Sequence, residues 1–181
     1  MADVTLTYKG STIAEMNDTG TKTLKTSGKY CEGDIGVSYV KPASGSSDEL
    51  AKKIITGEGD ITELPSGITK IKTGVFTASS NLKITYIPDG VTSIGGTSFQ
   101  SCQNLITISI PNSVTSIGFW AFNSCLNLTT VIFKGTPTDI YSNAFSTCDK
   151  LTDIYVPWAE GAVADAPWGA TNATIHYNTT T

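Results

Sequence analysis

The sequence is poor in the residues that catalysis and charge-driven binding require. It has one histidine, His176, and only 15% of its 181 residues are charged. A single histidine leaves little scope for a Ser-His-Asp or Cys-His nucleophile. Twelve basic residues against 16 acidic ones give a net charge of −4, which argues against binding to nucleic acid or to an anionic membrane. We therefore expect a non-enzymatic protein without a cofactor or a metal.

Long apolar segments are also missing. No run approaches the roughly 18 residues of a membrane span, so membrane insertion is not expected. The first residues lack a basic segment followed by an apolar one, so no secretory signal is predicted. Asp139, Asp149 and Asp153 lack the spacing of a calcium-binding loop and are interpreted as solvated turn carboxylates.

What the sequence does contain is a repeat with a constant step of 23 residues. The same residue types recur in four columns, without an insertion. The columns are Leu82, Leu105, Leu128 and Leu151; Ile71, Ile94, Ile117 and Ile140; Phe76, Phe99, Phe122 and Phe145; and Ser79, Cys102, Cys125 and Cys148. A fixed step of this kind is typical of a solenoid in which each repeat is one coil. The sequence predicts a mainly β solenoid of about four coils, with equivalent side chains stacked in its interior.

Each coil is expected to contain a short strand with alternate residues facing inward. In the central repeat these are Leu105, Ile108 and Ile110. The first repeat has Thr85 at the position of Ile108, so we expect a looser core there.

The cysteine column has two interpretations. Three thiols in register could suggest metal or redox chemistry, but one cysteine per coil provides neither a C-x-x-C pair nor histidine partners. Alternatively, cysteine is a small residue that is readily buried in a tight interior turn. Strand spacing would permit a disulfide between neighbouring coils, yet stacked Cβ vectors point the same way, so free thiols are predicted. Cys31 has no evident partner.

The segments that flank the repeats suggest three parts. Residues 1–41 contain short alternating runs divided by turn residues, which predicts a small β module for attachment or oligomerisation. Residues 42–47 form a linker. Residues 48–181 form the solenoid, with a short capping helix that ends near Gly57 and a C-terminal cap that contains Trp158 and Trp168.

A binding surface is expected on the outward positions of the strands. By alternation these are Ile84, Tyr86, Thr107, Ser109, Thr130, Ile132, Asp153 and Tyr155. Tyrosine is enriched in binding hot spots, although Thr, Tyr and Ile also simply suit strands. Trp120 replaces Gly74, Thr97 and Asn143 of the other coils and is predicted to project outward as a separate anchor.

The repeat resembles a known family. Residues 105–125 follow L-x-x-I-x-I-P-x-x-V-T-x-I-G-x-x-A-F-x-x-C, a pattern similar to the BspA-like leucine-rich repeats of bacterial surface proteins, and the resemblance covers about residues 61–157. It departs from the pattern at Lys72 and Tyr141, where two coils have glycine, and at Lys134, where proline is expected. The resemblance implies a leucine-rich repeat solenoid for adhesion or recognition, without catalytic residues.

The flanks resemble a narrower group. The first 40 residues look like short β modules of phage and prophage structural proteins, and residues 153–178 are similar to the C-terminal ends of repeat proteins from the same setting. These resemblances imply a non-enzymatic virion component of the tail, baseplate or capsid surface, attached to other virion proteins through residues 1–41. The alternative is a bacterial cell-surface adhesin. Either would bind a protein or a surface glycan, and the N-terminal module could form a homo-oligomer.

Overall fold

The computed structural model describes the strand backbones at residues 4–8, 11–16, 21–24 and 35–39, and all of residues 59–64 and 68–179. The described part contains only strands and turns, without a helix. The linker expected at residues 42–47 and the capping helix expected before Gly57 lie outside the described residues, as does Cys31.

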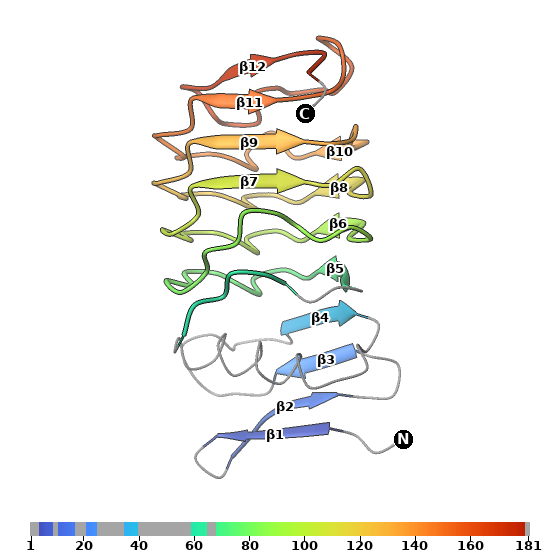
Figure 1. Ribbon diagram of the computed structural model, residues 1–181, viewed down its shortest axis with the longest axis vertical. Coiled ribbons are helices and arrows are strands. Elements are labelled where there is room, and N and C mark those ends of the chain that lie inside the picture. Colours follow the sequence, from blue (N-terminus) through green and yellow to red (C-terminus); the bar gives the residue numbers. More distant parts are fainter. Residues whose placement is uncertain are drawn as a thin grey trace.

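Two sheets run along the molecule, as Figure 1 shows. The longer sheet has the order β1-β2-β3-β4-β5-β6-β8-β10 and the shorter one β12-β11-β9-β7. The strands of the longer sheet are β1 (Val4–Tyr8), β2 (Ser11–Met16), β3 (Thr21–Leu24), β4 (Ile35–Tyr39), β5 (Ile68–Ile71), β6 (Ser93–Ile94), β8 (Ser116–Ile117) and β10 (Asp139–Ile140). Those of the shorter sheet are β7 (Thr107–Ile110), β9 (Thr130–Phe133), β11 (Asp153–Tyr155) and β12 (Thr174–His176).

The direction of pairing changes at β5. Strands β1 to β4 pair antiparallel, and β4 also pairs antiparallel with β5. From β5 onward every pair is parallel, with residues 23 positions apart opposite each other in the β6–β8, β8–β10, β7–β9 and β9–β11 pairs. Parallel strands must be joined by long connections, and here each connection is one coil. The predicted solenoid is therefore confirmed.

The interior consists of the predicted columns. The rings of Phe76, Phe99, Phe122 and Phe145 stack with centroid separations of 5.3, 5.0 and 5.1 Å and interplanar angles of 13° or less. All four leucines of the first column have no exposed surface. The four coils predicted are extended by a bridge between Ile61 and Leu82 at one end and by β12 at the other.

Polar side chains form ladders that hold successive coils together on the outside. The hydroxyls of Thr92, Thr115 and Thr138 donate to the backbone carbonyls of Thr69, Thr92 and Thr115 at 3.0 to 3.1 Å. The amides of Asn104 and Asn127 donate to carbonyls of the preceding coil. In the threonine ladder each of these carbonyls also accepts from the backbone amide of the same threonine, so the hydroxyl adds a second hydrogen bond between the two coils.

The first coil departs from the alternation that the sequence predicts. Ile84 is 1% exposed and lies in the core, whereas Thr85 is exposed, so the outward position expected for Ile84 is wrong. Between Leu82 and Ile87 the chain forms only isolated bridges rather than a strand, and strict alternation therefore does not apply. The apolar side chain turns inward because burial is favourable for it, and it takes the place that Thr85 would have left loosely filled.

Two tryptophans close the C-terminal end of the described core. Trp168 is fully buried and Trp158 is 7% exposed, and both rings pack against Phe133, with centroids 5.8 and 5.3 Å away. The indole nitrogen Nε1 of Trp168 donates to the carbonyl of Ala164 at 2.7 Å, and the Trp168 carbonyl accepts from the amide of Phe145 at 2.9 Å. Trp168 thereby satisfies its one polar side-chain group and packs its ring against Phe133 and Trp158 at this end of the core.

Candidate recognition surface

The outward residues of the shorter sheet form two adjoining columns, which we call the strand face. Parallel pairing aligns Thr107, Thr130 and Asp153 in the first column. It aligns Ser109, Ile132 and Tyr155 in the second column, which Tyr86 extends through its bridge to Ser109. Tyr86 is 45% exposed, and the six other residues are partly exposed. The structure thus brings together every strand residue predicted for the surface except Ile84.

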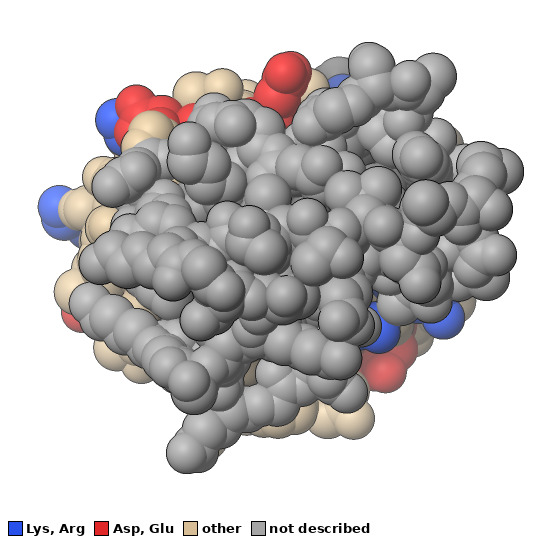
Figure 2. Space-filling model, turned by 90° about the horizontal axis from the view of Figure 1, so that it is seen from below, with Lys and Arg blue, Asp and Glu red and all other residues tan. Residues whose placement is uncertain are grey.

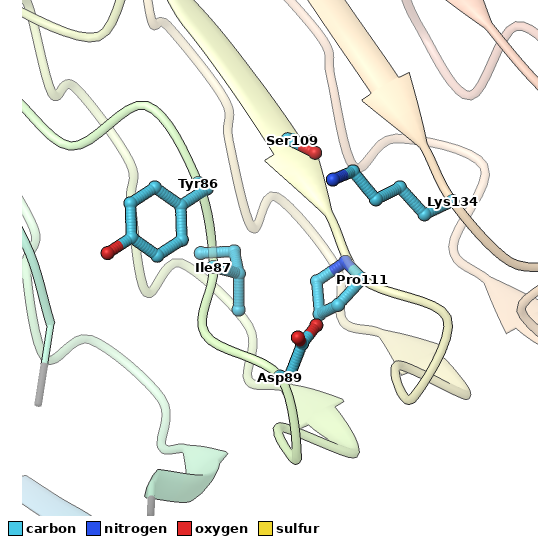
Figure 3. Close-up of a pocket in the computed structure, with 6 residues that line it drawn as sticks. All are labelled: Tyr86, Ile87, Asp89, Ser109, Pro111 and Lys134. Atoms are coloured by element: carbon cyan, nitrogen blue, oxygen red, sulfur yellow. The ribbon is translucent and has the colours of Figure 1, made fainter. Parts of the chain in front are cut away.

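The strand face contains a hollow of about 120 Å³. Its lining residues are Tyr86, Ile87, Asp89, Ser109, Pro111 and Lys134 (Figure 3). Ser109 lies between the bulkier Tyr86 and Ile132 in its column, and this small side chain leaves the depression. Asp89 follows the first strand segment in the turn that begins at Pro88, and Lys134 follows β9. Sequence reasoning noted Lys134 only as a departure from proline and did not predict its place at this hollow.

The charged groups of the hollow have no partners among the described residues. Neither Asp89 nor Lys134 makes an ion pair or a side-chain hydrogen bond there, although both are exposed. By contrast, the Nζ of Lys83 lies 2.8 Å from the carboxylate of Asp60 at the N-terminal end of the coils. In the view of Figure 2, acidic and basic side chains of the described residues both appear around the rim of the molecule.

The strand face ends at an interaction between β11 and β12. The imidazole Nε2 of His176 lies 2.8 Å from the Asp153 carboxylate, and its ring stacks on Tyr155 with centroids 4.5 Å apart. Hydrogen bonds from Thr152 and then from His176 lower the pKa of Asp153. The one histidine therefore fixes the orientation of two predicted surface residues, Asp153 and Tyr155.

Trp120 lies away from the strand face, in an aromatic cluster with Phe119 and Tyr141. These residues are 44–52% exposed, and the Phe119 ring makes edge contacts with Trp120 and Tyr141 at 5.9 and 6.3 Å. Trp120 has a φ of 54°, in the left-handed region that a bulky residue rarely adopts. A Cβ at Gly96 would lie 2.7 Å from the Phe119 ring, so the ring occupies space that only a glycine at position 96 leaves open.

Sequence reasoning predicted the exposure of Trp120 but missed its two neighbours. The signal was present: Phe119 and Tyr141 both occupy positions at which a neighbouring coil has glycine, Gly96 and Gly118 respectively. Because strand alternation says nothing about side chains in the turns, neither residue was identified.

The predicted cysteine column is buried and reduced. Cys102, Cys125 and Cys148 are free thiols, as predicted, and each Sγ donates to the carbonyl of a phenylalanine 26 residues earlier at 3.0 to 3.1 Å. Burial raises the pKa of Cys102 to about 12. The hydrogen bond with the Cys148 side chain, together with burial, raises the pKa of Cys125 above its usual range. Cys102 and Cys125 are therefore poor nucleophiles, and all three buried thiols act as packing residues.

The described residues contain no group of three or more His, Cys, Asp or Glu side chains placed to hold a metal ion. Within the same residues, no helix has the length and apolar character needed to cross a membrane.

Comparison with solved structures finds leucine-rich proteins at low sequence identity. A leucine-rich repeat protein from Bacteroides ovatus ATCC 8483 has 22% identity and a TM-score of 0.47, over 87% of this chain and 47% of that one. A leucine-rich cell surface protein from Faecalibacterium prausnitzii A2-165 has 21% identity and a TM-score of 0.34, over 62% and 48% of the two chains. A T. pallidum leucine-rich repeat protein has 20% identity and a TM-score of 0.35, over 66% and 67%. The chain thus spans less than half of the first two proteins.

Comparison with curated proteins gives no match. The family model of the BspA type leucine-rich repeat region matches residues 60–161 in six copies. This region is more than half of the 181 residues and coincides with the coils whose side chains stack in the interior. The chain therefore belongs to the BspA type leucine-rich repeat family.

Proposed function

We propose that this protein is a non-enzymatic recognition module and that the strand face contains its binding site. The observation that carries the proposal is the hollow at Tyr86, Ser109 and Lys134, where exposed aromatic and charged groups surround a depression on a rigid sheet. Binding sites of this kind are concave and have a few convergent polar groups. Membership of a leucine-rich repeat family supports a binding role, because solenoids use extended surfaces for recognition.

The proposed setting is the surface of a bacterial cell, where the module contacts host proteins, other cells or surface glycans. The BspA type family supports this setting more than the virion setting that the flanking sequences suggest. In the virion setting, strands β1 to β4 would attach the chain to other virion proteins or to a second copy. Immunogold labelling of the producing bacterium and of its purified phage particles decides between the two settings.

The binding site is tested with a double variant, Tyr86→Ala and Tyr155→Ala. Both side chains belong to the exposed column of the strand face, and neither is part of the buried core. We expect the labelled variant to lose at least tenfold in affinity for bacterial or epithelial cells, because tyrosine side chains often dominate binding energy. The melting temperature should stay within about 2 °C of the unmodified protein, since surface substitutions rarely change stability by more than about 0.5 kcal/mol.

Tyr141→Ala is the matched comparison, because it removes the same side chain from the aromatic cluster, where Trp120 is proposed as a separate anchor. A loss of cell binding with Tyr141→Ala and none with the double variant would move the site from the strand face to this cluster. Unchanged binding in both variants would remove both surfaces from consideration.

A further inference from the structure

The hollow on the strand face is formed by residues that differ from coil to coil, in contrast to the repeated interior. Ser109 occupies a column that has Tyr86, Ile132 and Tyr155 in the other coils. Lys134 stands where the equivalent positions have Pro88, Pro111 and Pro157. The combination of Ser109 and Lys134 that forms the hollow is therefore not repeated at the equivalent positions of the other coils.

Three hydrogen-bonding side chains face this hollow from three successive coils. They are the Asp89 carboxylate, the Ser109 hydroxyl and the Lys134 ammonium group, whereas the hydroxyl of Tyr86, which also lines the hollow, points away from them (Figure 3). Asp89 offers only acceptors and Lys134 only donors, whereas the Ser109 hydroxyl can do both. Since none of the three side chains has a hydrogen bond or ion pair in the described part of the chain, all three are available to a ligand.

The remaining lining is apolar. Ile87 and Pro111 are buried and form part of the wall, and the ring of Tyr86 is 45% exposed beside them. A ligand that fits must therefore present both an apolar surface and several hydroxyl-like groups within a small volume. The hollow of about 120 Å³ is small, so we take roughly one six-membered ring as the part of the ligand that it holds.

The charges of the hollow favour a neutral ligand. Asp89 and Lys134 are the charged residues of the lining, and their charges cancel. An anion or a cation would gain attraction from one group and repulsion from the other, and both groups are exposed and screened by water. A neutral ligand with vicinal hydroxyls can instead donate to the carboxylate and accept from the ammonium group, and hydrogen bonds to charged groups are the stronger ones.

We propose that this hollow binds one neutral hexopyranose residue of a glycan. A pyranose ring has C–H faces that can lie against Tyr86 and Pro111, and its hydroxyls match the carboxylate, ammonium and hydroxyl groups of the lining. This inference rests on the proposed recognition function and narrows it to one class of ligand. A zwitterion, such as the termini of a peptide, is the competing occupant for the same pair of charges.

The test measures binding of the full chain to an array of neutral and sialylated glycans, with free methyl hexopyranosides and glycylglycine as competitors. We expect neutral hexose-terminated glycans to bind, a free methyl hexopyranoside to compete, and glycylglycine to have no effect. Changing the salt concentration from 50 to 500 mM should alter the affinity less than threefold, because the ligand carries no charge.

Single variants test whether the glycans of the array bind at the hollow. We expect Asp89→Asn, Lys134→Gln and Tyr86→Leu each to weaken glycan binding at least tenfold. Lys83→Gln is the matched control, because it removes an exposed lysine whose partner is Asp60 rather than the hollow, and it should bind as the unmodified protein does. A normal circular dichroism spectrum and melting curve for each variant excludes loss of the fold as the cause.

The outcomes distinguish this inference from the broader function. Absence of glycan binding, equal binding by all variants, or competition by glycylglycine would each overturn the carbohydrate assignment. If the chain then still binds cells and the Tyr86→Ala and Tyr155→Ala double variant does not, the recognition function stands with a different ligand. If binding to cells is also unaffected by that double variant, the proposed site on the strand face fails as well.

Discussion

The interior and the exposed surface of this solenoid follow opposite rules. In the interior, phenylalanine lies on phenylalanine and leucine on leucine, with ring separations that differ by only a few tenths of an ångström from coil to coil. On the strand face, one column reads Tyr86, Ser109, Ile132 and Tyr155, four positions that pair from coil to coil and carry three different residue types. The repeated interior columns therefore specify the fold. The residues of the strand face are not constrained by this packing, so they can differ between coils and form a site such as the hollow.

A second comparison concerns the turns, where the backbone repeats even though the side chains vary. Ala78, Ser101, Ser124 and Thr147 are equivalent positions, and all four have φ between 56° and 58°. Gly74, Thr97 and Trp120 form another such column, with φ of 75°, 54° and 54°. The stacked coils therefore impose the left-handed backbone conformation on residue types that rarely adopt it.

The largest effect should come from the centre of the interior. Phe122 stacks on both Phe99 and Phe145 and has no exposed surface. Phe122→Ala should therefore lower the free energy of unfolding by about 3–5 kcal/mol, because it removes apolar contacts and leaves a cavity. Urea denaturation followed by circular dichroism measures this change. A loss below about 1 kcal/mol would mean that the ring is not in the middle of a packed stack.

The thiol column gives a chemical test of the same interior. In a Cys31→Ser background, alkylation of Cys102 by iodoacetamide at pH 8 should be about a thousandfold slower than that of an exposed cysteine, because burial raises the thiol pKa to about 12 and only the thiolate reacts. Mass spectrometry of timed samples gives the rate at each cysteine. Unfolding in urea should restore ordinary reactivity, and fast labelling of the folded protein would contradict the buried position.

At the end of the core, where the 23-residue period stops, Trp168 replaces the next coil. Trp168→Ala should cost about 3 kcal/mol, since it removes the ring that packs on Phe133 and Trp158 and the hydrogen bond to Ala164. The loss should appear as a lower melting temperature. Trp120→Ala is the control: its indole is 45% exposed, and the change should be less than half as large. Equal losses for both tryptophans would show that Trp168 does not close the core.

The smallest effect tests the repeated turn backbone. Ala78 is exposed and has a φ of 56°, so Ala78→Gly should raise the free energy of unfolding by about 0.5 kcal/mol by relieving the left-handed conformation. Ala159→Gly, at an exposed alanine outside the positive-φ set, should lower it by about 0.5–1 kcal/mol. Thermal unfolding compares the two, and changes of the same sign would contradict the account of the turns.

The fold was predictable from the sequence because the interior is the part that repeats. Predicting a buried column such as Leu82, Leu105, Leu128 and Leu151 required only the constant 23-residue step and the preference of large apolar side chains for burial. Ile84 was predicted wrongly because alternation requires an extended strand, and the first coil forms isolated bridges instead.

The candidate site was predictable only in part. Tyr86, Ser109 and Tyr155 followed from strand alternation, but the hollow depends on residues in turns, Asp89 and Pro111, and on the reach of Lys134. Turn side chains have no fixed period, and the position of one turn relative to the next coil is a tertiary property. Trp120 was predicted to project outward, but its neighbours Phe119 and Tyr141 were missed for the same physical reason.

The central claim is that residues 23 positions apart contact each other in one continuous interior stack, and a double-mutant cycle between Phe99 and Phe122 tests it most directly. Their ring centroids are 5.0 Å apart, so Phe99→Leu and Phe122→Leu should be non-additive, with a coupling energy of about 0.5–1.5 kcal/mol. Phe76 and Phe145 stack only through the two rings between them and should be additive within about 0.5 kcal/mol. Additivity of the Phe99 and Phe122 substitutions would contradict the stack.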